Sequence, residues 1–524
     1  MGDELHHECG VAALYWLDTP VGRGGAAEAL VRKGDVTPLM PTVLQDIQNR
    51  GQLAAGMTSF NPQRPQLIDT YKEIGTVAEA FRMNHSGKHR AILSEYAGKA
   101  AIGHVRYATC GQEDTSYAQP FERHHGRRWK WFSFAFNGNI ANFAERKRAL
   151  LRKQDYHIIR DGDTEIIMHA LSYASRGDRR PNLVSMVRSL SDQFDGAYNI
   201  VFLNARGDMF VARDPLGFRP LSYAVEGRLF AAASESVALR NLGFTEVHDV
   251  EPGTMVVIED GKLSIRRFAP SPCHAHCFFE WIYFANVAST MDGSSTYLCR
   301  ARLGQRLAER EDQPTDSDDC VVVPVPDTAK AAADSMAYHL GVPSMEGLIR
   351  NRYVGRTFIE GAGGRLQKVR MKYTPIPAVL SGRRIFLVED SLVRATTMRA
   401  LVERLRQEGK AREIHVRIAC PPIIAPCFYG IDMSTLGELF APKYINGGYR
   451  GRLSDAVAAK MARDLGVDSL RYLTVDDLAD CLQIDHDHLC TGCVTGKYPT
   501  RWGNRLLAKA REAARDGKAG RTYE

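Results

Sequence analysis

The sequence lacks any long hydrophobic run. No stretch approaches the roughly 18 uncharged apolar residues that a membrane-spanning helix needs. The first eight residues carry Asp3 and Glu4 and contain no apolar segment of the kind found in secretion signals. These absences argue against a membrane protein, and we expect the chain to remain in the cytoplasm.

The sequence also lacks a strong excess of charge of one sign. Lys and Arg total 68 against 61 Asp and Glu, a formal net charge of +7. Such a mild excess suits a polyphosphate substrate but is too small to indicate a nucleic-acid partner. Internal repeats and low-complexity tracts are missing too, and the composition is that of an ordinary globular protein.

The chain is long enough for more than one domain. A chain of 524 residues exceeds the size at which one hydrophobic core keeps growing, so two or more domains are expected. Two prolines interrupt any regular element at residues 269–272 and mark the join. We therefore expect one domain over residues 9–268, a second over 269–507, and a polar tail over 508–524 that forms a loosely held helix or a frayed end.

The two domains show different patterns. The first is predicted to be α+β and antiparallel, with its clearest helix at residues 164–173. Its short β-rich runs, broken by turn residues, lie at residues 10–14, 101–106, 197–203 and 209–213. The second is predicted to be α/β with a parallel sheet, because the apolar runs at 320–325 and 384–388 are each followed by a loop and a helical stretch.

The chain has 11 cysteines and no secretion signal. In that setting thiols stay reduced, and spaced pairs indicate metal binding or catalysis rather than disulfides. Cys9 stands at the head of an apolar run, which would hold it at the start of a buried strand. From spacing alone, a cysteine at the edge of the core is as good an interpretation as a nucleophile.

Several downstream segments favour the nucleophile. They are residues 48–52 (Gln-Asn-Arg-Gly-Gln), 103–107 (Gly-His-Val-Arg-Tyr), 137–139 (Asn-Gly-Asn), 162–165 (Gly-Asp-Thr-Glu), 214–215 (Asp-Pro), 219–221 (Arg-Pro-Leu) and 233–236 (Ala-Ser-Glu-Ser). In this order they resemble the class II glutamine amidotransferase domain of the N-terminal nucleophile fold, an αββα sandwich.

The resemblance implies a role for each matched residue. Cys9 becomes residue one after removal of a propeptide, residues 1–8, because its α-amino group, with an ordinary pKa of about 7.7 to 8.0, serves as base for the thiol. Cys9 attacks the glutamine amide, while the Asn137 side chain and the Gly138 N–H stabilise the oxyanion. Arg106 and Asp163 hold the α-carboxylate and the α-ammonium of glutamine.

Each of these residues also has a structural interpretation. Arg106 could form a surface ion pair, Asp163 could cap a helix, and Asn137 with Gly138 could form a hairpin turn. For any one of these residues alone, the structural interpretation would be preferred. Only the occurrence of all the segments together favours a glutaminase site. The chain departs from the family at Asn49 and Phe136, where His is usual, and both departures bear on glutaminase rate or specificity.

The second domain contains an apolar strand, an acidic pair, a small-residue loop and a helix that we expect to begin near Met398. Backbone N–H groups at such a helix start can bind phosphate, and the carboxylates of Glu389 and Asp390 can hold ribose hydroxyls or Mg²⁺. A strand-to-helix turn with an acidic cap is an equally good interpretation of this segment alone.

Residues 384–397 resemble the signature of type I phosphoribosyltransferases, and residues 351–358 resemble a stretch typical of amidophosphoribosyltransferases. Residues 323–328 resemble the pyrophosphate loop of that family, with Thr328 near the metal, as Glu389 and Asp390 are. The implied substrate-binding residues are Arg352, Lys368, Arg370, Glu389, Asp390, Ser391, Thr396 and Thr397.

Lys368, Arg370 and Lys372 fall on what resembles a flexible lid that closes over the substrate; a solvated charged loop is the alternative. Two further departures occur in the signature. Glu389 replaces the more usual Asp, and Ala395 stands where Gly is common. A positive φ or a close backbone approach at Ala395 would cost affinity for the sugar phosphate.

Cys490 and Cys493 form a C-x-x-C pair, which could be a metal half-site, a redox pair or chance. Cys277 and Cys427 match the other two ligand positions in the iron-sulfur-bearing branch of the family, which implies a structural [4Fe-4S] cluster. Physics alone leaves a Cys₄ zinc site open. Cys273 is a possible competing ligand, and the expected core thiols are Cys110, Cys299, Cys320, Cys420 and Cys481.

Together the two halves imply a glutamine-dependent amidophosphoribosyltransferase. Ammonia released at Cys9 attacks C1 of Mg²⁺-bound phosphoribosyl diphosphate, giving phosphoribosylamine, glutamate and pyrophosphate, the first step of de novo purine synthesis. A protected passage for ammonia, a homo-oligomeric state, often a tetramer, and inhibition by purine nucleotides are expected by analogy.

Two alternatives remain. An amidotransferase that feeds a sugar isomerase would lack the signature at residues 384–397. A divergent paralogue that binds phosphoribosyl diphosphate or nucleotides as a regulator is suggested by Asn49, Phe136 and Ala395. Cleavage before Cys9 discriminates, because a pure binding protein gains nothing from it.

Overall fold

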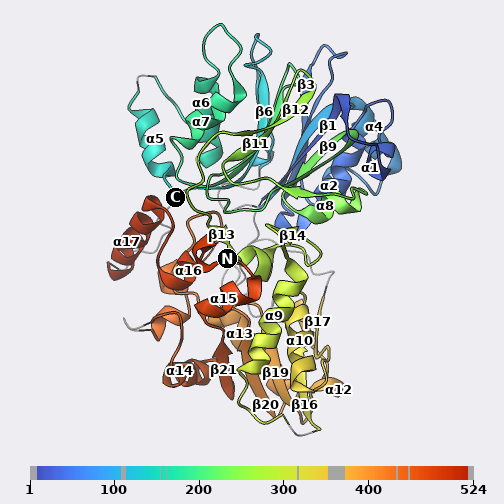
Figure 1. Ribbon diagram of the computed structural model, residues 1–524. Coiled ribbons are helices and arrows are strands. Elements are labelled where there is room, and N and C mark those ends of the chain that lie inside the picture. Colours follow the sequence, from blue (N-terminus) through green and yellow to red (C-terminus); the bar gives the residue numbers. More distant parts are fainter. Residues whose placement is uncertain are drawn as a thin grey trace.

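A computed structural model describes residues 9–107, 114–153, 155–160, 162–315, 318–351, 372–431, 433, 435–445 and 449–516. The first half of the sequence forms a strand-rich body, and the second half forms a body with a smaller sheet flanked by helices (Figure 1). The expected propeptide, residues 1–8, lies outside the described residues, as do Cys110, Arg352, Lys368 and Arg370.

Two six-stranded antiparallel sheets build the first body. The first runs in the order β10-β9-β1-β4-β2-β3 and the second in the order β12-β11-β8-β7-β6-β5. The strands of the first sheet are β1 (Gly10–Val21), β2 (Ala54–Phe60), β3 (Ile68–Ile74), β4 (Ala100–Arg106), β9 (Ser222–Ala233) and β10 (His248–Asp249). Those of the second are β5 (Phe121–Arg123), β6 (Phe132–Ile140), β7 (Gly196–Asn204), β8 (Met209–Arg213), β11 (Thr254–Glu259) and β12 (Lys262–Arg267).

The alternation of side chains along β1 shows how the layers stack. Val11 and Ala13 pack between the two sheets, whereas Ala12 and Leu14 pack against helices on the outer face. The outer helices of the first sheet are α1 (Ala26–Ala29), α2 (Met40–Asp46), α3 (Val77–Ala80), α4 (Ser86–Glu95) and α8 (Ser236–Asn241). Those of the second are α5 (Phe143–Leu151), α6 (Asp163–Ala174) and α7 (Leu183–Ser191). The predicted αββα sandwich is confirmed.

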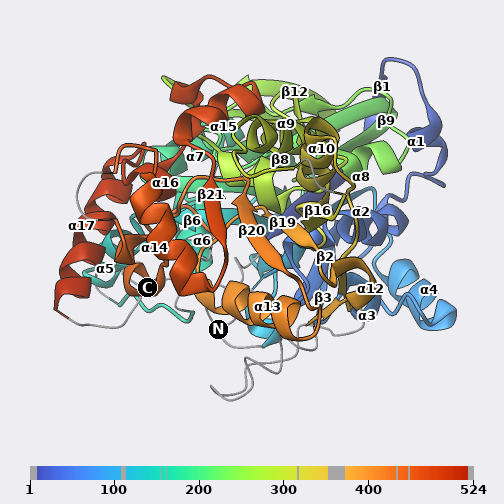
Figure 2. The same cartoon turned by 90° about the horizontal axis from the view of Figure 1, so that it is seen from below.

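The second body is built on a four-stranded parallel sheet in the order β16-β19-β20-β21. Its strands are β16 (Cys320–Pro324), β19 (Arg384–Glu389), β20 (Glu413–Ile418) and β21 (Ser469–Tyr472). The central β19 is apolar without a break from Ile385 to Val388 because both of its faces are covered. Figure 2 shows α9 (Thr296–Glu309) and α10 (Lys330–Leu340) on one side of this sheet and α13 (Ala395–Gln407) on the other. The predicted α/β domain with a parallel sheet is confirmed.

Three small strand pairs complete the second half: β13 (His276–Cys277) with β22 (Leu489–Cys490), β14 (Thr290–Met291) with β15 (Ser294–Ser295), and β17 (Leu348–Arg350) with β18 (Tyr373–Pro375). The remaining helices are α12 (Pro377–Leu380), α14 (Asp455–Leu465), α15 (Val475–Leu482), α16 (Gly492–Thr495) and α17 (Arg501–Arg515). The parallel pair β13-β22 joins the beginning of this half to its end.

The last described helix, α17, crosses the expected start of the polar tail at residue 508. Leu506, Leu507 and Ala510 are buried on one face of this helix, so the packing continues beyond the expected boundary. The backbone N–H of Trp502 donates to Asp195 Oδ2 at 3.2 Å, which ties α17 to the first body. Among the described residues, no helix combines the length and the hydropathy of a membrane span.

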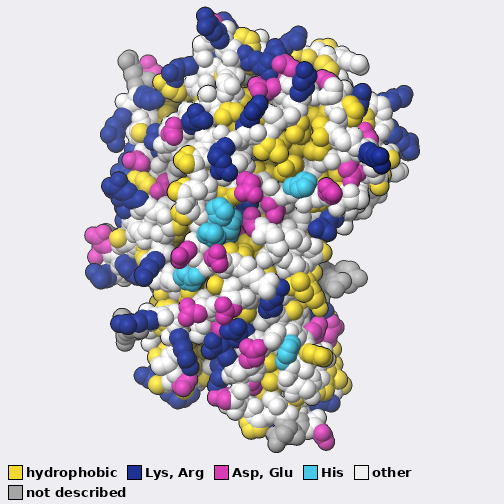
Figure 3. Space-filling view, in the orientation of Figure 1, with side chains coloured by type: hydrophobic (Ala, Val, Ile, Leu, Met, Phe, Trp, Pro, Cys, Tyr) yellow, Lys and Arg dark blue, Asp and Glu magenta, His cyan; other side chains and the backbone are white. Residues whose placement is uncertain are grey.

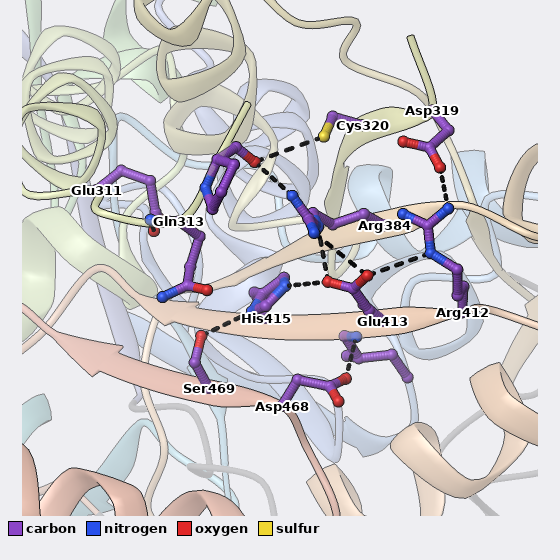
Figure 4. A network of polar contacts seen from close by, with 12 residues as sticks. Glu311, Gln313, Asp319, Cys320, Arg384, Arg412, Glu413, His415, Asp468 and Ser469 are labelled. Atoms are coloured by element: carbon purple, nitrogen blue, oxygen red, sulfur yellow. Dashed lines mark hydrogen bonds and ion pairs between the residues drawn. The ribbon is translucent and has the colours of Figure 1, made fainter. Parts of the chain in front are cut away.

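A polar network lies where β19 and β20 begin (Figure 4). Glu413 accepts hydrogen bonds from Arg384 Nε at 2.7 Å and from Arg412 Nε at 3.2 Å. His415 Nε2 lies 3.2 Å from the same carboxylate, and its Nδ1 lies 2.8 Å from Ser469 Oγ. The network therefore joins neighbouring strands at the edge of the sheet opposite to the acidic pair that ends β19.

Candidate active site

Cys9 lies immediately before β1, and its Sγ donates to the carbonyl oxygen of Tyr107 at 3.6 Å. This neighbour follows from sheet register, because β1 and β4 are antiparallel with Gly10 opposite Val105. The same register brings the end of β4, and so Arg106, beside Cys9. Two residues that lie far apart in the sequence thus meet at one edge of the first sheet.

Arg106 is buried, with 6% of its surface exposed, which rules out the alternative of a surface ion pair. Its guanidinium lies over the ring of Tyr117, 5.5 Å from the centroid. Gly51 packs against its backbone so closely that a Cβ there would lie 2.5 Å from the carbonyl carbon of Arg106. A cation held in this way is oriented before any carboxylate arrives.

Asn137 lies near the end of β6 and is 1% exposed. Within the described part of the chain, neither its Nδ2 nor its Oδ1 has a hydrogen-bond partner. A buried amide without partners costs about 1 to 3 kcal/mol, so its retention indicates a partner that comes with the ligand. The next residue, Gly138, has φ +145°, and a Cβ there would lie 2.0 Å from the carbonyl oxygen of Ala197, so only glycine fits.

Phe136 points away from this site. Its ring packs with the helices on the outer face of the second sheet, whereas Asn137, the next residue on the strand, has the opposite orientation. The departure at Phe136 is therefore absorbed by the core and not by the site.

Asp163 is the first residue of α6, and the N-cap position is occupied by Gly162. Asp163 is therefore not the N-cap residue, which was its alternative interpretation. Asp163 Oδ2 accepts from the backbone N–H of Ile140 at 3.3 Å, so the carboxylate lies against the strand that carries Asn137. Burial raises the pKa of Asp163 to about 6, against N–H donors that lower it. An ammonium group beside it would favour the charged form.

His104 is completely buried on β4, two residues before Arg106. Burial, together with the charge of Arg106, lowers its pKa to about 3, so the imidazole is neutral and a weak base near neutral pH. His104 belongs to the segment 103–107 that resembles the amidotransferase family, but the sequence indicated no role for this residue. A weak base here leaves the α-amino group as the base that the resemblance implies.

The acidic pair lines a cavity of about 110 Å³ at the carboxyl ends of β16 and β19. Thr328 donates to Asp390, and Ser391 Oγ donates to Asp390 Oδ1 at 2.6 Å. Burial and the neighbouring Asp390 raise the pKa of Glu389 well above its usual range, and burial raises that of Asp390. A divalent cation would offset both effects, so the oxygen donors fit Mg²⁺.

Some of the predicted substrate-binding residues line this cavity and one of the described ones, Thr396, does not. Ser391 and Thr397 line it, and so does Lys372, whose pKa burial lowers to about 8. Thr396 is exposed and does not line it, because adjacent residues on a helix point in different directions. Arg394, inside the signature at residues 384–397, also lines the cavity, and so do Tyr283 and Arg350, which the sequence did not indicate.

The helix after the acidic pair begins at Ala395, three residues before the predicted start near Met398. Ala395 is buried in this first turn and is not among the described residues with positive φ. The backbone cost that a positive φ would impose on Ala395 therefore does not arise.

The four predicted ligand cysteines are buried at one place. Cys277 lies opposite Cys490 in the β13-β22 pair, and the carbonyl oxygen of Cys493 accepts from Ile424 N at 2.8 Å and Ala425 N at 3.0 Å, which brings in the Cys427 segment. Burial raises the pKa of Cys493, and the thiols of Cys427, Cys277 and Cys490 raise it further, so the four lie within electrostatic reach. Iron or zinc cations would offset that repulsion, so the chemistry of these four thiols, as distinct from their present spacing, suits a thiolate-bound metal centre.

The remaining described thiols are divided as follows. Cys273 is exposed, whereas Cys299, Cys320, Cys420 and Cys481 are buried core thiols as predicted. Among the described residues, no group of three or more His, Cys, Asp or Glu is arranged to hold a single metal ion.

A buried charge network joins the two bodies. Arg50 donates to Glu235 at 2.7 Å and to Glu280 at 2.7 Å and 3.2 Å, and all three side chains are buried. Asn49 Nδ2 donates to Glu235 at 2.7 Å and to the carbonyl oxygen of Phe284 at 2.9 Å. The residue that replaces the usual His is therefore part of this contact between the halves.

The halves also enclose a second hollow, of about 740 Å³, outside both sites. Figure 3 shows histidine and acidic side chains gathered where the two bodies meet, and the lining includes His248, His274, His488 and Asp249.

Comparison with known proteins agrees with this geometry. A family model described as a glutamine amidotransferase domain matches residues 72–258. The chain is 37% identical over 503 residues to the amidophosphoribosyltransferase of Methanothermobacter thermautotrophicus, covering 95% of each chain. It is 35% identical to that of Bacillus subtilis, covering 90% of this chain and 93% of the relative.

The solved structure of the B. subtilis glutamine phosphoribosylpyrophosphate amidotransferase, complexed with ADP and GMP, superposes with a TM-score of 0.77. The two sequences are 33% identical there, over 94% of this chain and 98% of the other. The architecture, the order of the two half-sites and the full-length similarity agree, and the chain belongs to the amidophosphoribosyltransferase family.

Proposed function

We propose that this enzyme transfers the amide nitrogen of glutamine to 5-phosphoribosyl 1-diphosphate, giving 5-phosphoribosylamine, glutamate and pyrophosphate. One observation carries the proposal: the buried, unpartnered amide of Asn137 lies on the strand that holds Asp163, in a body whose other sheet brings Cys9 beside Arg106. A thiol nucleophile, an oxyanion donor and two charges for an amino acid are the parts that glutamine hydrolysis requires.

In the first half-reaction, the Cys9 thiolate attacks the amide carbon of glutamine. Asn137 Nδ2 and the Gly138 N–H stabilise the negative oxygen, ammonia leaves, and water then releases glutamate from the thioester. The α-amino group of Cys9 acts as the base, which requires removal of residues 1–8. Arg106 and Asp163 fix the substrate by its α-carboxylate and α-ammonium.

In the second half-reaction, ammonia attacks C1 of the ribose and pyrophosphate departs. Mg²⁺, when bound, neutralises charge on the pyrophosphate. Glu389 and Asp390 hold the ribose hydroxyls or the metal, and Thr328 holds Asp390 in place. Ser391, Thr397 and the N–H groups at the start of α13 bind the 5-phosphate, and Arg352, together with Lys368 and Arg370 of the expected lid, would bind the substrate.

The two sites have a direct physical link. Tyr283 lines the transferase cavity, and the adjacent Phe284 accepts a hydrogen bond from Asn49 of the first body. A short protected route for ammonia suits this arrangement, because ammonium in water is not a nucleophile.

Three further properties belong to the proposal. Cys277, Cys427, Cys490 and Cys493 hold a structural [4Fe-4S] cluster, purine nucleotides inhibit the enzyme, and the chain forms homo-oligomers, by analogy tetramers. The nucleotide proposal is supported by the ADP and GMP named for the similar B. subtilis structure.

The test measures glutamate and pyrophosphate together, with glutamine, phosphoribosyl diphosphate and Mg²⁺ supplied to anaerobically purified protein that begins at Cys9. We expect the two products to rise in step, and Cys9→Ala to abolish glutamate release while the reaction with free ammonia persists. Cys273→Ala, which changes an exposed thiol, is the matched control. Mature wild-type protein that releases neither product would contradict the proposal.

A further inference from the structure

The end of β6 that carries the expected oxyanion donors rests on a segment of the other half of the chain. Asn139 Nδ2 donates to the carbonyl oxygen of Phe428 at 3.0 Å, across 289 positions of sequence. Gly430 lies against Gly138 so closely that a Cβ on Gly430 would lie 3.2 Å from the Gly138 carbonyl carbon. We call residues 428–430 the support segment.

The support segment is itself held from several sides. Arg219 Nη2 donates to the carbonyl oxygen of Tyr429 at 2.7 Å, and the backbone N–H of Tyr429 donates to Cys427 Sγ at 3.3 Å. The ring of Tyr429 stacks on Phe218 with 4.2 Å between centroids. Arg219 is buried and also contacts Glu280 at 3.3 Å, which places the segment in the charge network between the halves.

An oxyanion hole is effective only when its donors are fixed before the charge develops. Asn137 and Gly138 lie in the last residues of β6, and the following residue, Asn139, is tied to Phe428. A shift of this strand end by about 1 Å would move both donors away from the developing oxyanion and would cost about 100-fold in rate. The contact of Asn139 with Phe428 opposes such a shift.

We infer that Asn139 and Gly430 are positioning residues for glutamine hydrolysis, and that the support segment of the transferase half completes the oxyanion hole of the glutaminase half. The inference rests on the proposed function. Asn139 and Gly430 act through Asn137 and Gly138 and do not themselves hold glutamine.

Two variants test it. Asn139→Ala removes the donor to Phe428, and Gly430→Ala adds a methyl group against Gly138 at a position with φ +107°. We expect either change to lower kcat for glutamine hydrolysis by about 10- to 100-fold. The KM for glutamine should stay within about 3-fold, because Arg106 and Asp163 are untouched. Phosphoribosylamine formation from free ammonia, which bypasses Cys9, should be retained.

Asn142→Ala is the matched control, because Asn142 Nδ2 also donates to a backbone carbonyl, Gln193 O at 2.9 Å, but within the first half. We expect it to lower the melting temperature without the selective loss of kcat. Wild-type kcat for glutamine in Asn139→Ala would overturn the inference, and so would equal losses with glutamine and with ammonia. If wild-type protein releases no glutamate, the proposed function fails instead.

Discussion

The carboxylate of Asp163 is buried beside Ile140, and burial raises its pKa to about 6. Above that pH the folded protein carries a buried charge that the unfolded chain exposes to water, so the group lowers stability at neutral pH. The cost shrinks as the pH falls from about 6 toward the unfolded value of about 3.9, and below that value, where both states hold the proton, it is gone. Such a cost agrees with the proposed role of Asp163 in binding the α-ammonium of glutamine.

Asp163→Asn should therefore separate stability from binding. We expect the free energy of unfolding to rise by about 1 to 2 kcal/mol near pH 7.5 and to change little near pH 3.5, below the unfolded pKa of about 3.9. The KM for glutamine should rise at least about 10-fold, because an amide cannot pair with the α-ammonium. Urea unfolding at both pH values and glutaminase kinetics check this, and an unchanged KM would remove Asp163 from the site.

Thr396 and Thr397 show how far residue-level prediction reaches. The signature predicts both as substrate ligands, but only Thr397 lines the cavity, since one residue on a helix turns the side chain by about 100°. We expect Thr397→Ala to raise the KM for phosphoribosyl diphosphate about 10-fold and Thr396→Ala to raise it less than about 2-fold. Steady-state kinetics with free ammonia measure this without involving Cys9, and equal effects would contradict the assignment.

Among the elements, the strands were the most predictable. Successive residues of β1 are buried on opposite faces of the sheet, and β19 is buried on both faces and is therefore apolar without a break. Both patterns can be read directly from a sequence. The start of α13 was less predictable. Residues 391–397 are mostly small or β-branched and suit either a loop or a first helical turn, and the burial of Ala395 by the rest of the fold selects the helix.

The network at the start of β19 and β20 should affect how the stability of the protein changes in acid. Chiefly through its bond to Arg384, the pKa of Glu413 is lowered to about 2. Its contribution to stability is therefore present above the unfolded pKa of about 4.3 and is lost as the pH falls toward 2. Glu413→Gln should lower the melting temperature near pH 7 and should have a shrinking effect below about pH 4.

This network lies far from the acidic pair along β19, so Glu413→Gln should leave the ammonia-dependent rate unchanged at neutral pH. Asp468, which immediately precedes β21, accepts from the backbone N–H of Ile414 at 2.6 Å and does not bond Glu413. Melting curves over a range of pH values, compared with the wild type, measure the effect; a constant difference at every pH would show that the carboxylate charge is not its source.

At the scale of the whole molecule, the contacts that complete the sites have no local signature. Three hydrogen bonds join distant parts of the chain: Asn139 with Phe428, Arg219 with Tyr429, and Asn49 with Phe284. No periodic pattern in the sequence predicts such pairs. Motif order could predict which residues belong to each half-site. It could not predict that one half supports the other, because that depends on how two complete bodies pack.

The proposed cysteine centre would also be a property of the whole molecule, since its four expected ligands come from three distant segments. We expect Cys427→Ser to lose the bound metal and the exposed Cys273→Ser to retain it. Iron with acid-labile sulfide, measured on anaerobically purified protein, would support the cluster. Zinc without sulfide would establish the Cys₄ alternative instead, and full metal retention in Cys427→Ser would exclude that ligand.

The pairing of β13 with β22 also sets an order of events during synthesis. Cys277 leaves the ribosome long before Cys490, its partner in the strand pair, exists. The same is true of Asn139 and Phe428. If the support segment positions the oxyanion donors as inferred, a nascent or truncated chain carries the nucleophile without that support, and we expect it to spare glutamine until the half that consumes the ammonia has been made.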